Sequence, residues 1–215
     1  MFWERAYRKA GKIWRQDPHP KVVELAMQLE LEGCRRVLDV GCGSGRHCHY
    51  LARRGLEAVG IDVSYSALTT ARLATETSGL SLALFAQASV DGLPFPNAAF
   101  DAAVSYGGVL SFLHNDRLPQ AVAEIIRVLK EGGFFLATVF STADHSYGLG
   151  QEIAPRTFQN RDLLCHFFIE EEIQDLFRSL DFIALDHFVI EDTTHDQPHH
   201  HGCWQIQARR GERPS

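Results

Sequence analysis

The fold is decided by the stretch Val37-Leu38-Asp39-Val40-Gly41-Cys42-Gly43-Ser44-Gly45. It joins an apolar strand, predicted for residues 36–40, to a helix predicted for residues 46–54. Glycines allow a sharp backbone turn and let a ligand approach main-chain atoms. The N-terminus of the following helix adds N–H groups and a partial positive charge. The stretch therefore predicts a strand, a ligand-binding turn and a helix.

The spacing of these glycines separates two classes of ligand. A dinucleotide turn reads G-x-G-x-x-G, and its third glycine would fall on Arg46. The chain instead reads D-x-G-x-G-x-G, with Asp39 two residues before Gly41. A carboxylate at this point would repel a pyrophosphate and attract an ammonium group. S-adenosylmethionine has the ammonium and no phosphate, so the spacing favours it over NAD.

A second acid, Asp62, ends the next predicted strand at residues 58–61. A carboxylate at this point can accept hydrogen bonds from both hydroxyls of a ribose. It would do so for either cofactor, so Asp62 supports the binding of an adenosine without choosing between them.

Strands and helices alternate along most of the chain. Apolar runs predict strands at residues 36–40, 58–61, 82–86, 100–105, 134–140, 182–190 and 204–208. Periodic apolar positions predict helices at residues 21–32, 46–54, 64–77, 118–130 and 170–180. This alternation predicts an α/β fold with a mostly parallel sheet covered on both faces. No helix separates the last two strands, which are therefore expected to form an antiparallel hairpin.

Composition excludes several classes of protein. The chain has 215 residues, 45% of them hydrophobic, which is ordinary for a globular protein. The net charge of −6 disfavours a broad nucleic-acid interface. No apolar run is long enough for a membrane helix or a signal peptide. The five cysteines form no C-x-x-C, which indicates reduced thiols and a cytoplasmic location.

Four stretches resemble class I S-adenosylmethionine-dependent methyltransferases. They are residues 37–45, residues 60–64, Leu93-Pro94-Phe95-Pro96 with Phe100-Asp101, and residues 124–133. The resemblance implies a Rossmann-like, doubly wound sheet of seven strands in the order 3-2-1-4-5-7-6, with strand 7 antiparallel. It also implies S-adenosylmethionine as the cofactor and S-adenosylhomocysteine as the product.

The same resemblance implies which residues bind the cofactor. They are Asp39, Gly41, Cys42, Gly43, Asp62, Val63, Ser89, Val90 and Ser105. The glycine turn would hold the methionine moiety, Asp62 the ribose and Val63 the adenine. Ser89 stands where many relatives have an aspartate near the adenine, so the backbone N–H of Val90 is expected to serve instead. Ser105 and Tyr106 would lie beside the methyl group.

The substrate is expected to be a small molecule. Residues 45–51 and 147–153 resemble small-molecule methyltransferases of the tellurite-resistance and thiopurine types. Three alternatives are a methyltransferase of protein or RNA, a non-catalytic S-adenosylmethionine-binding protein and a NAD-dependent oxidoreductase. The acidic charge argues against RNA, and residues 105–108 lack the Pro-Pro pair of enzymes that methylate adenine or glutamine. The identity of the acceptor and the oligomeric state stay open.

Long connections leave the carboxyl ends of the strands at residues 106–117, 141–169 and 191–201. Ligands of such sheets bind beyond these ends. His114 and His166 are the preferred general bases, because each lies beside an apolar residue and histidine exchanges protons near neutral pH. With Tyr106 they make up the predicted catalytic set.

The chain is predicted to be one methyltransferase domain with three parts. Residues 1–32 would form a helical cover, residues 33–140 the cofactor-binding core, and residues 141–215 the substrate-side connection and the terminal hairpin. The cover hypothesis depends on four aromatic residues: Phe2, Trp3, Tyr7 and Trp14.

A histidine cluster close to the C-terminus raises the question of a metal. It contains His195, His199, His200, His201 and Cys203, which are ligand types that hold zinc. Adjacent residues of a strand point to opposite faces, which argues against convergence of all three consecutive histidines. The predicted site therefore includes no metal ligand.

Overall fold

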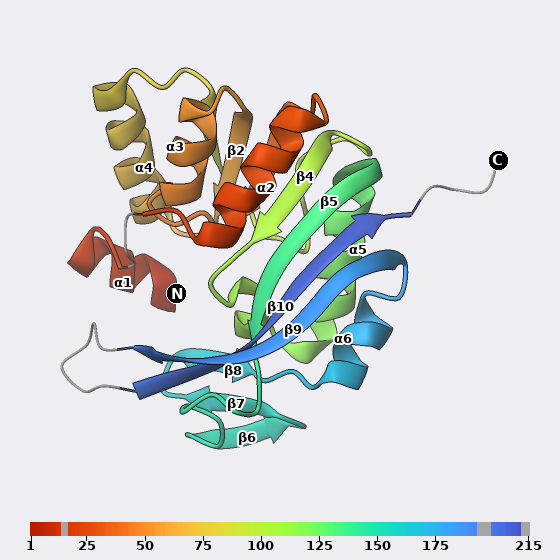
Figure 1. The fold of residues 1–215 in the computed structure, drawn as a ribbon. Coiled ribbons are helices and arrows are strands. Elements are labelled where there is room, and N and C mark those ends of the chain that lie inside the picture. Colours follow the sequence, from red (N-terminus) through yellow and green to blue (C-terminus); the bar gives the residue numbers. More distant parts are fainter. Residues whose placement is uncertain (14–16, 193–198, 212–215) are drawn as a thin grey trace.

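Seven strands form the central sheet of the computed structural model, which describes residues 1–13, 17–192 and 199–211 (Figure 1). The strands are β1 (Arg36–Val40), β2 (Glu57–Asp62), β3 (Ala83–Gln87), β4 (Phe100–Ser105), β5 (Leu129–Phe140), β9 (Leu180–Asp192) and β10 (His199–Arg210). Their order is β3-β2-β1-β4-β5-β10-β9. Strand β10 pairs antiparallel with both β5 and β9, and the other neighbours pair in parallel. The predicted order and the predicted terminal hairpin are confirmed.

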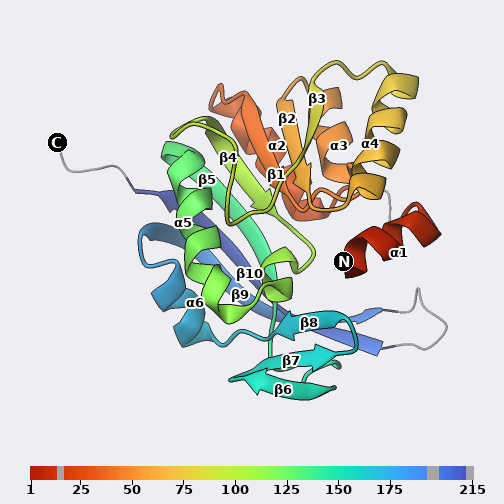
Figure 2. The same cartoon turned by 180° about the vertical axis from the view of Figure 1, so that it is seen from behind.

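Helices cover both faces of this sheet (Figures 1 and 2). The α-helices are α1 (Phe2–Ala10), α2 (Pro20–Leu31), α3 (Arg46–Arg53), α4 (Tyr65–Ser78), α5 (Leu118–Val128) and α6 (Glu170–Leu176). Two short 3₁₀ helices, η1 (Val109–Phe112) and η2 (Asn115–Arg117), precede α5.

The core is divided between the two faces by the alternation of side chains along each strand. Val37 of β1 packs with α2, α3 and α4 in one cluster. Its neighbour Leu38 packs with α5 and α6 in the other cluster. Full burial of a leucine or phenylalanine in such a cluster contributes about 1.5–3 kcal/mol. The strand segments predicted from apolar runs are therefore buried on both sides, as a parallel sheet requires.

Several elements differ from the predicted ones. Helix α6 ends at Leu176, four residues earlier than predicted, and β10 is longer at both ends than the strand predicted for residues 204–208. Helix α5 ends at Val128, two residues earlier than predicted, and β5 begins at once. A second sheet of three short antiparallel strands lies in the long connection at residues 141–169, where no strand is predicted. Its strands are β6 (Gln151–Ala154), β7 (Thr157–Asn160) and β8 (Leu163–His166). Each has four residues, and β6 is mostly exposed, so no apolar alternation marks them.

Helix α1 and the small sheet lie at the same edge of the main sheet, beyond the carboxyl ends of its parallel strands (Figure 2). Arg5 of α1 forms an ion pair with Asp162, in the turn between β7 and β8. Helix α1 also contacts α4, because the Glu4 carboxylate accepts hydrogen bonds from the hydroxyls of Ser64 and Ser66 and from the N–H of Ser66, at 2.7–3.1 Å. None of the helices in the described part of the chain is long and apolar enough to cross a membrane.

The Glu4 contact gives a pH-dependent prediction. Hydrogen bonds from Ser66 and Ser64 lower the pKa of Glu4 to about 2. A depressed folded pKa stabilises the fold fully above the unfolded pKa of about 4.3, and this stabilisation is lost as the pH falls towards the folded value. The wild type should therefore be more stable than Glu4→Gln by a constant margin from pH 7 to about 5, and the margin should vanish towards pH 2.

Urea unfolding at a series of pH values measures this margin. Glu171→Gln, on the exposed side of α6, is the matched control and should show no such trend. A Glu4→Gln margin that stays constant down to pH 2 would contradict the proposed role of the carboxylate.

Candidate functional site

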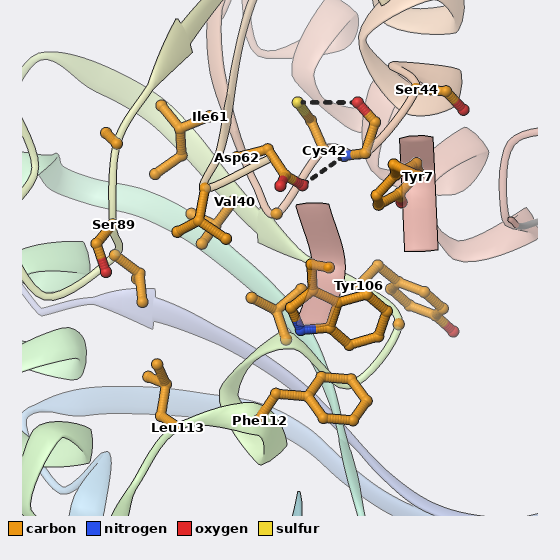
Figure 3. Close-up of a pocket in the computed structure, with 18 of the residues that line it drawn as sticks. Tyr7, Val40, Cys42, Ser44, Ile61, Asp62, Ser89, Tyr106, Phe112 and Leu113 are labelled. Carbon is orange, nitrogen blue, oxygen red and sulfur yellow. Dashed lines mark hydrogen bonds between the residues drawn. The ribbon is translucent and has the colours of Figure 1, made fainter. Parts of the chain in front are cut away.

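A pocket of about 270 Å³ opens where β1, β2 and β4 end, at the edge covered by α1 (Figure 3). Five segments far apart in the sequence line it. They are α1 with Trp3 and Tyr7, the end of β1 and its turn at residues 40–47, the end of β2 at residues 61–63, residues 88–90 after β3, and residues 106–117 after β4. The pocket thus lies at the carboxyl ends of the parallel strands, where ligands of doubly wound sheets bind.

The glycine turn forms one wall of the pocket. Gly41, Gly43 and Gly45 all have positive φ angles, of 68°, 55° and 83°. A Cβ atom on Gly41 would lie 2.5 Å from Val109, and one on Gly43 would meet the hydroxyl of Tyr7. The turn therefore needs glycine for its backbone conformation and for the close approach of neighbouring side chains.

Asp62 lies beside this turn and is almost fully buried. Its carboxylate accepts a hydrogen bond from the N–H of Gly43 at 2.9 Å (Figure 3). It also accepts one from the N–H of Ser64 at 2.8 Å. Burial raises the pKa of Asp62, although these two hydrogen bonds oppose the rise. The carboxylate is thus held at the pocket wall by the backbone, with acceptor capacity for the hydroxyls of a ligand.

Asp39 lies behind the turn and is not among the residues that line the pocket. It is 1% exposed, and the thiol of Cys48 donates to one of its oxygens at 3.4 Å. Burial raises the pKa of Cys48 well above its usual range, which keeps the thiol protonated as a donor. The other Asp39 oxygen lies 3.8 Å from Nδ1 of His47, a lining residue. Asp39 therefore places negative charge beneath the turn without forming its surface.

Tyr106 closes the pocket at the end of β4 and belongs to a hydrogen-bond chain. The N–H of Lys21 donates to Nδ1 of His19, and Nε2 of His19 lies 2.9 Å from the Tyr106 hydroxyl. That hydroxyl donates to Oε1 of Gln205 at 3.3 Å. Since Nδ1 accepts, Nε2 carries the proton of the neutral ring and donates to Tyr106.

The two titratable side chains in this series of hydrogen bonds, His19 and Tyr106, stay neutral near pH 7. Burial, with the nearby charge of Arg46, lowers the pKa of His19 to about 4. Burial also raises the pKa of Tyr106 above its usual range. The Tyr106 hydroxyl is therefore a fixed hydrogen-bonding group at the pocket wall, oriented by its hydrogen bonds to His19 and Gln205.

Ser89 and Val90 line the pocket at its other end, together with Val63. The Ser89 hydroxyl donates to Asp91 at 2.5 Å and accepts from Arg117 at 3.2 Å. The hydroxyl of Ser89, which stands where many relatives have an aspartate, is therefore already hydrogen-bonded within the protein. Of the predicted cofactor-binding residues, Ser105 is fully buried and its hydroxyl has no hydrogen-bond partner in the described part of the chain.

The two predicted general bases lie away from the pocket lining. The His114 ring is about half exposed and bonds Asp116 at 2.8 Å. His166 is fully buried at the end of β8, where Nδ1 bonds Thr157 at 2.8 Å and Nε2 bonds Glu172 at 3.1 Å. Both ring nitrogens of His166 are engaged within the protein. A base role for either histidine stays a prediction.

Several lining residues were not among the predicted site residues. They are Met1, Trp3, Tyr7, Val40, Ser44, Arg46, His47, Ile61, Ala88, Gly107, Val109, Phe112, Leu113 and Arg117. For Trp3 and Tyr7 the sequence holds a signal, since aromatic residues four apart share one helix face. Trp14 lies outside the described residues. Phe112 and Arg117 carry no local signal, because the path of the connection after β4 brings them to the pocket.

The comparisons with known proteins agree with this geometry. Residues 37–133 match the family profile of a methyltransferase domain. A fatty-acid O-methyltransferase of Mycolicibacterium smegmatis is 37% identical over 115 residues, which cover 53% of this chain and 39% of that protein. The chain spans about half the length of the curated relatives it matches.

Solved structures match over a longer span. A methyltransferase of Methanosarcina mazei superimposes with a TM-score of 0.76 at 24% identity, covering 92% of this chain and all of the other. TehB of Haemophilus influenzae gives a TM-score of 0.71 at 19% identity, covering 97% and 67%. Both share the fold.

The glycine turn, the acid after β2 and the sheet order define the class I fold of S-adenosylmethionine-dependent methyltransferases. The match to the methyltransferase domain family covers residues 37–133 of this chain.

Proposed function

We propose that this protein transfers a methyl group from S-adenosylmethionine to a small-molecule acceptor by in-line displacement. The observation that carries the proposal is the pocket, which has the glycine turn and Asp62 on one side and the aromatic residues of α1 and η1 on the other. The ligand to which this turn and acid are suited carries an ammonium group and a ribose, and S-adenosylmethionine has both.

The cofactor would lie along the carboxyl ends of β1 and β2. The turn with Gly41 and Gly43 would hold the methionine moiety, Asp62 would accept the ribose hydroxyls, and Val63 and Val90 would flank the adenine. S-adenosylmethionine supplies the methyl group as a sulfonium, so the protein needs to align the acceptor at about 3 Å from the methyl carbon.

A small acceptor is supported by what encloses the rest of the pocket. Trp3 packs edge-to-face on Phe112 with ring centroids 4.7 Å apart, and both rings line the pocket. The ion pair of Arg5 with Asp162 and the contacts of Glu4 with Ser64 attach α1 to two other segments of the chain. Residues 1–32 would thus cover the site. The net charge of −6 further disfavours a polyanionic substrate.

Catalysis would depend on positioning. Tyr106 and His19 are neutral and orient each other, so they would place an acceptor rather than ionise it. Such a site suits an acceptor that brings a reactive nucleophile of its own, such as a carboxylate or a thiolate. The matched relative that methylates a fatty acid acts on a carboxylic acid, which is consistent with this class.

The five cysteines are all free, which supports a cytoplasmic location.

The test offers the purified protein S-adenosylmethionine with a labelled methyl group and three acceptor pools: a small-molecule filtrate, proteins and RNA. The RNA pool is included because one matched relative, of Saccharomyces cerevisiae, methylates 18S rRNA. Label in the filtrate alone supports the proposal. Label in protein or RNA overturns the acceptor class, and cofactor binding without transfer to any pool overturns the catalytic assignment.

A further inference from the structure

Three histidines outside the pocket bring their ring nitrogens together. His145 follows β5, and His199 and His201 open β10. One ligand nitrogen of each ring lies within 4.8 Å of the other two. His199 and His201 are two residues apart on a strand and so share a face, whereas His200 between them points to the opposite face. Because of this alternation, only two of the three consecutive histidines can point to one ligand site. The third histidine of the group, His145, comes from another segment.

Main-chain contacts bring His145 to this face. The N–H of Ser141 donates to the carbonyl of Gly202 at 2.8 Å, and the N–H of His145 donates to that of His200 at 3.3 Å. A side chain at residue 202 would collide with the backbone of Ala143 and Asp144. Glycine at this position therefore allows the connection after β5 to lie directly on β10.

Two of the rings are oriented by hydrogen bonds from Nδ1. Nδ1 of His201 lies 2.9 Å from a carboxylate oxygen of Asp144, which is almost fully buried. Nδ1 of His145 lies 3.0 Å from the carbonyl oxygen of His200. An Nδ1 that donates to a carboxylate or a carbonyl leaves Nε2 as the metal-binding nitrogen, which is the arrangement found around histidine ligands of zinc.

The distance between two of the nitrogens fits a bound ion. Nε2 of His199 and Nε2 of His201 are 3.2 Å apart. Two nitrogens bound to a tetrahedral zinc at ~2.0 Å lie ~3.3 Å from each other. The same distance also fits a hydrogen bond between two neutral rings, and titration with Zn²⁺ distinguishes a metal site from such a bond.

We propose that His145, His199 and His201 bind one divalent transition-metal ion, Zn²⁺, with Asp144 as the positioning residue of His201. Three protein nitrogens leave a fourth coordination position for water or a ligand. None of the three histidines lines the cofactor pocket. The ring of His201 stacks on Phe140 at 5.8 Å, and Phe140 packs against Phe112 of the pocket at 5.7 Å. The ion would therefore brace the acceptor side of the pocket through this aromatic contact.

This site modifies the expectation drawn from the sequence. Of the cluster named there, His199 and His201 take part, and Cys203 and His200 do not belong to the group of converging ligands. His195 lies outside the described residues. The third ligand, His145, comes from a segment more than fifty residues earlier.

The experiment uses the full chain without a histidine tag, treated with a chelator and dialysed, and titrates it with Zn²⁺ in a calorimeter. The expected result is one Zn²⁺ per chain, a higher melting temperature with the ion and intense visible bands on substitution with Co²⁺, as tetrahedral coordination gives. His145→Ala and His199→Ala should each abolish this binding. Asp144→Asn should weaken it by about 10–100-fold, since it leaves all three ligands in place.

His200→Ala is the matched control, on the same strand but on the opposite face, and should bind Zn²⁺ like the wild type. Because the histidines lie outside the pocket, binding of S-adenosylmethionine reports whether each variant is folded, and the titration itself needs no methyl transfer. Absence of Zn²⁺ binding by the wild type, or equal binding by His145→Ala and His199→Ala in folded form, would overturn the proposal.

Discussion

Replacing Asp62 with Ala should lower the affinity for S-adenosylmethionine by at least ~100-fold. In the proposed complex the carboxylate accepts both ribose hydroxyls, and each hydrogen bond to a charged group is worth ~1.5–3 kcal/mol. Every ~1.4 kcal/mol corresponds to a tenfold change in affinity. The substitution also removes the acceptor of the Gly43 and Ser64 N–H groups, so the glycine turn loses its tie to β2.

Calorimetric titration with S-adenosylmethionine measures this loss, and thermal unfolding shows whether the variant is folded. Asp175→Ala removes a carboxylate from the exposed side of α6 and is the matched control. Its affinity should equal that of the wild type. Equal affinities for a folded Asp62→Ala and the wild type would contradict the ribose role of Asp62.

Gly43→Ala should impair both stability and cofactor binding. The φ angle of +55° is unfavourable for alanine, at a cost of about 1–2 kcal/mol. The new methyl group would also meet the hydroxyl of Tyr7, and overpacking of this kind costs about 1–3 kcal/mol. Since Tyr7 and the turn both line the pocket, we expect the affinity for S-adenosylmethionine to fall ~10-fold or more.

Two further variants separate these effects. Gly79→Ala has a similar φ of +65° at the end of α4 but meets no atom within 4 Å, so it should lose stability without losing affinity. Tyr7→Phe combined with Gly43→Ala removes the hydroxyl and should restore part of the affinity. A single Gly43→Ala variant that binds like Gly79→Ala would contradict the role of the close contact with Tyr7.

Much of the fold was predictable from local sequence. The D-x-G-x-G-x-G stretch, the apolar strands and the acid at the end of β2 are patterns within a few residues of one another, and the pocket lies at the strand ends where they point. Gly41, Gly43, Asp62, Val63 and Val90 all line the pocket, and their cofactor contacts stay predictions. The short strands β6, β7 and β8 were not predictable, since their positions are set by pairing with each other and not by an apolar pattern.

Local sequence identifies few of the residues on the candidate substrate side of the pocket. Apolar neighbours in the sequence point to His114 and His166, but in the structure their rings bond Asp116, Thr157 and Glu172 outside the pocket lining. Proximity in sequence says little about which way a connection folds over the sheet. The residues that do line this side, such as Trp3 and Phe112, come from segments more than a hundred positions apart.

Local sequence predicts the alternation of strands and helices, the terminal hairpin and the glycine turn, because each depends on the backbone preferences of glycine and on the periodicity of apolar residues. The order of the sheet is implied by the resemblance of the motifs to a known family. What covers the pocket and which histidines converge follow from the tertiary structure alone. Helix α1 reaches the pocket through Glu4 and Arg5, whose partners are distant in sequence. His145 reaches His201 because Gly202 leaves room for a passing backbone. Such contacts depend on the packing of whole elements, which no local pattern encodes.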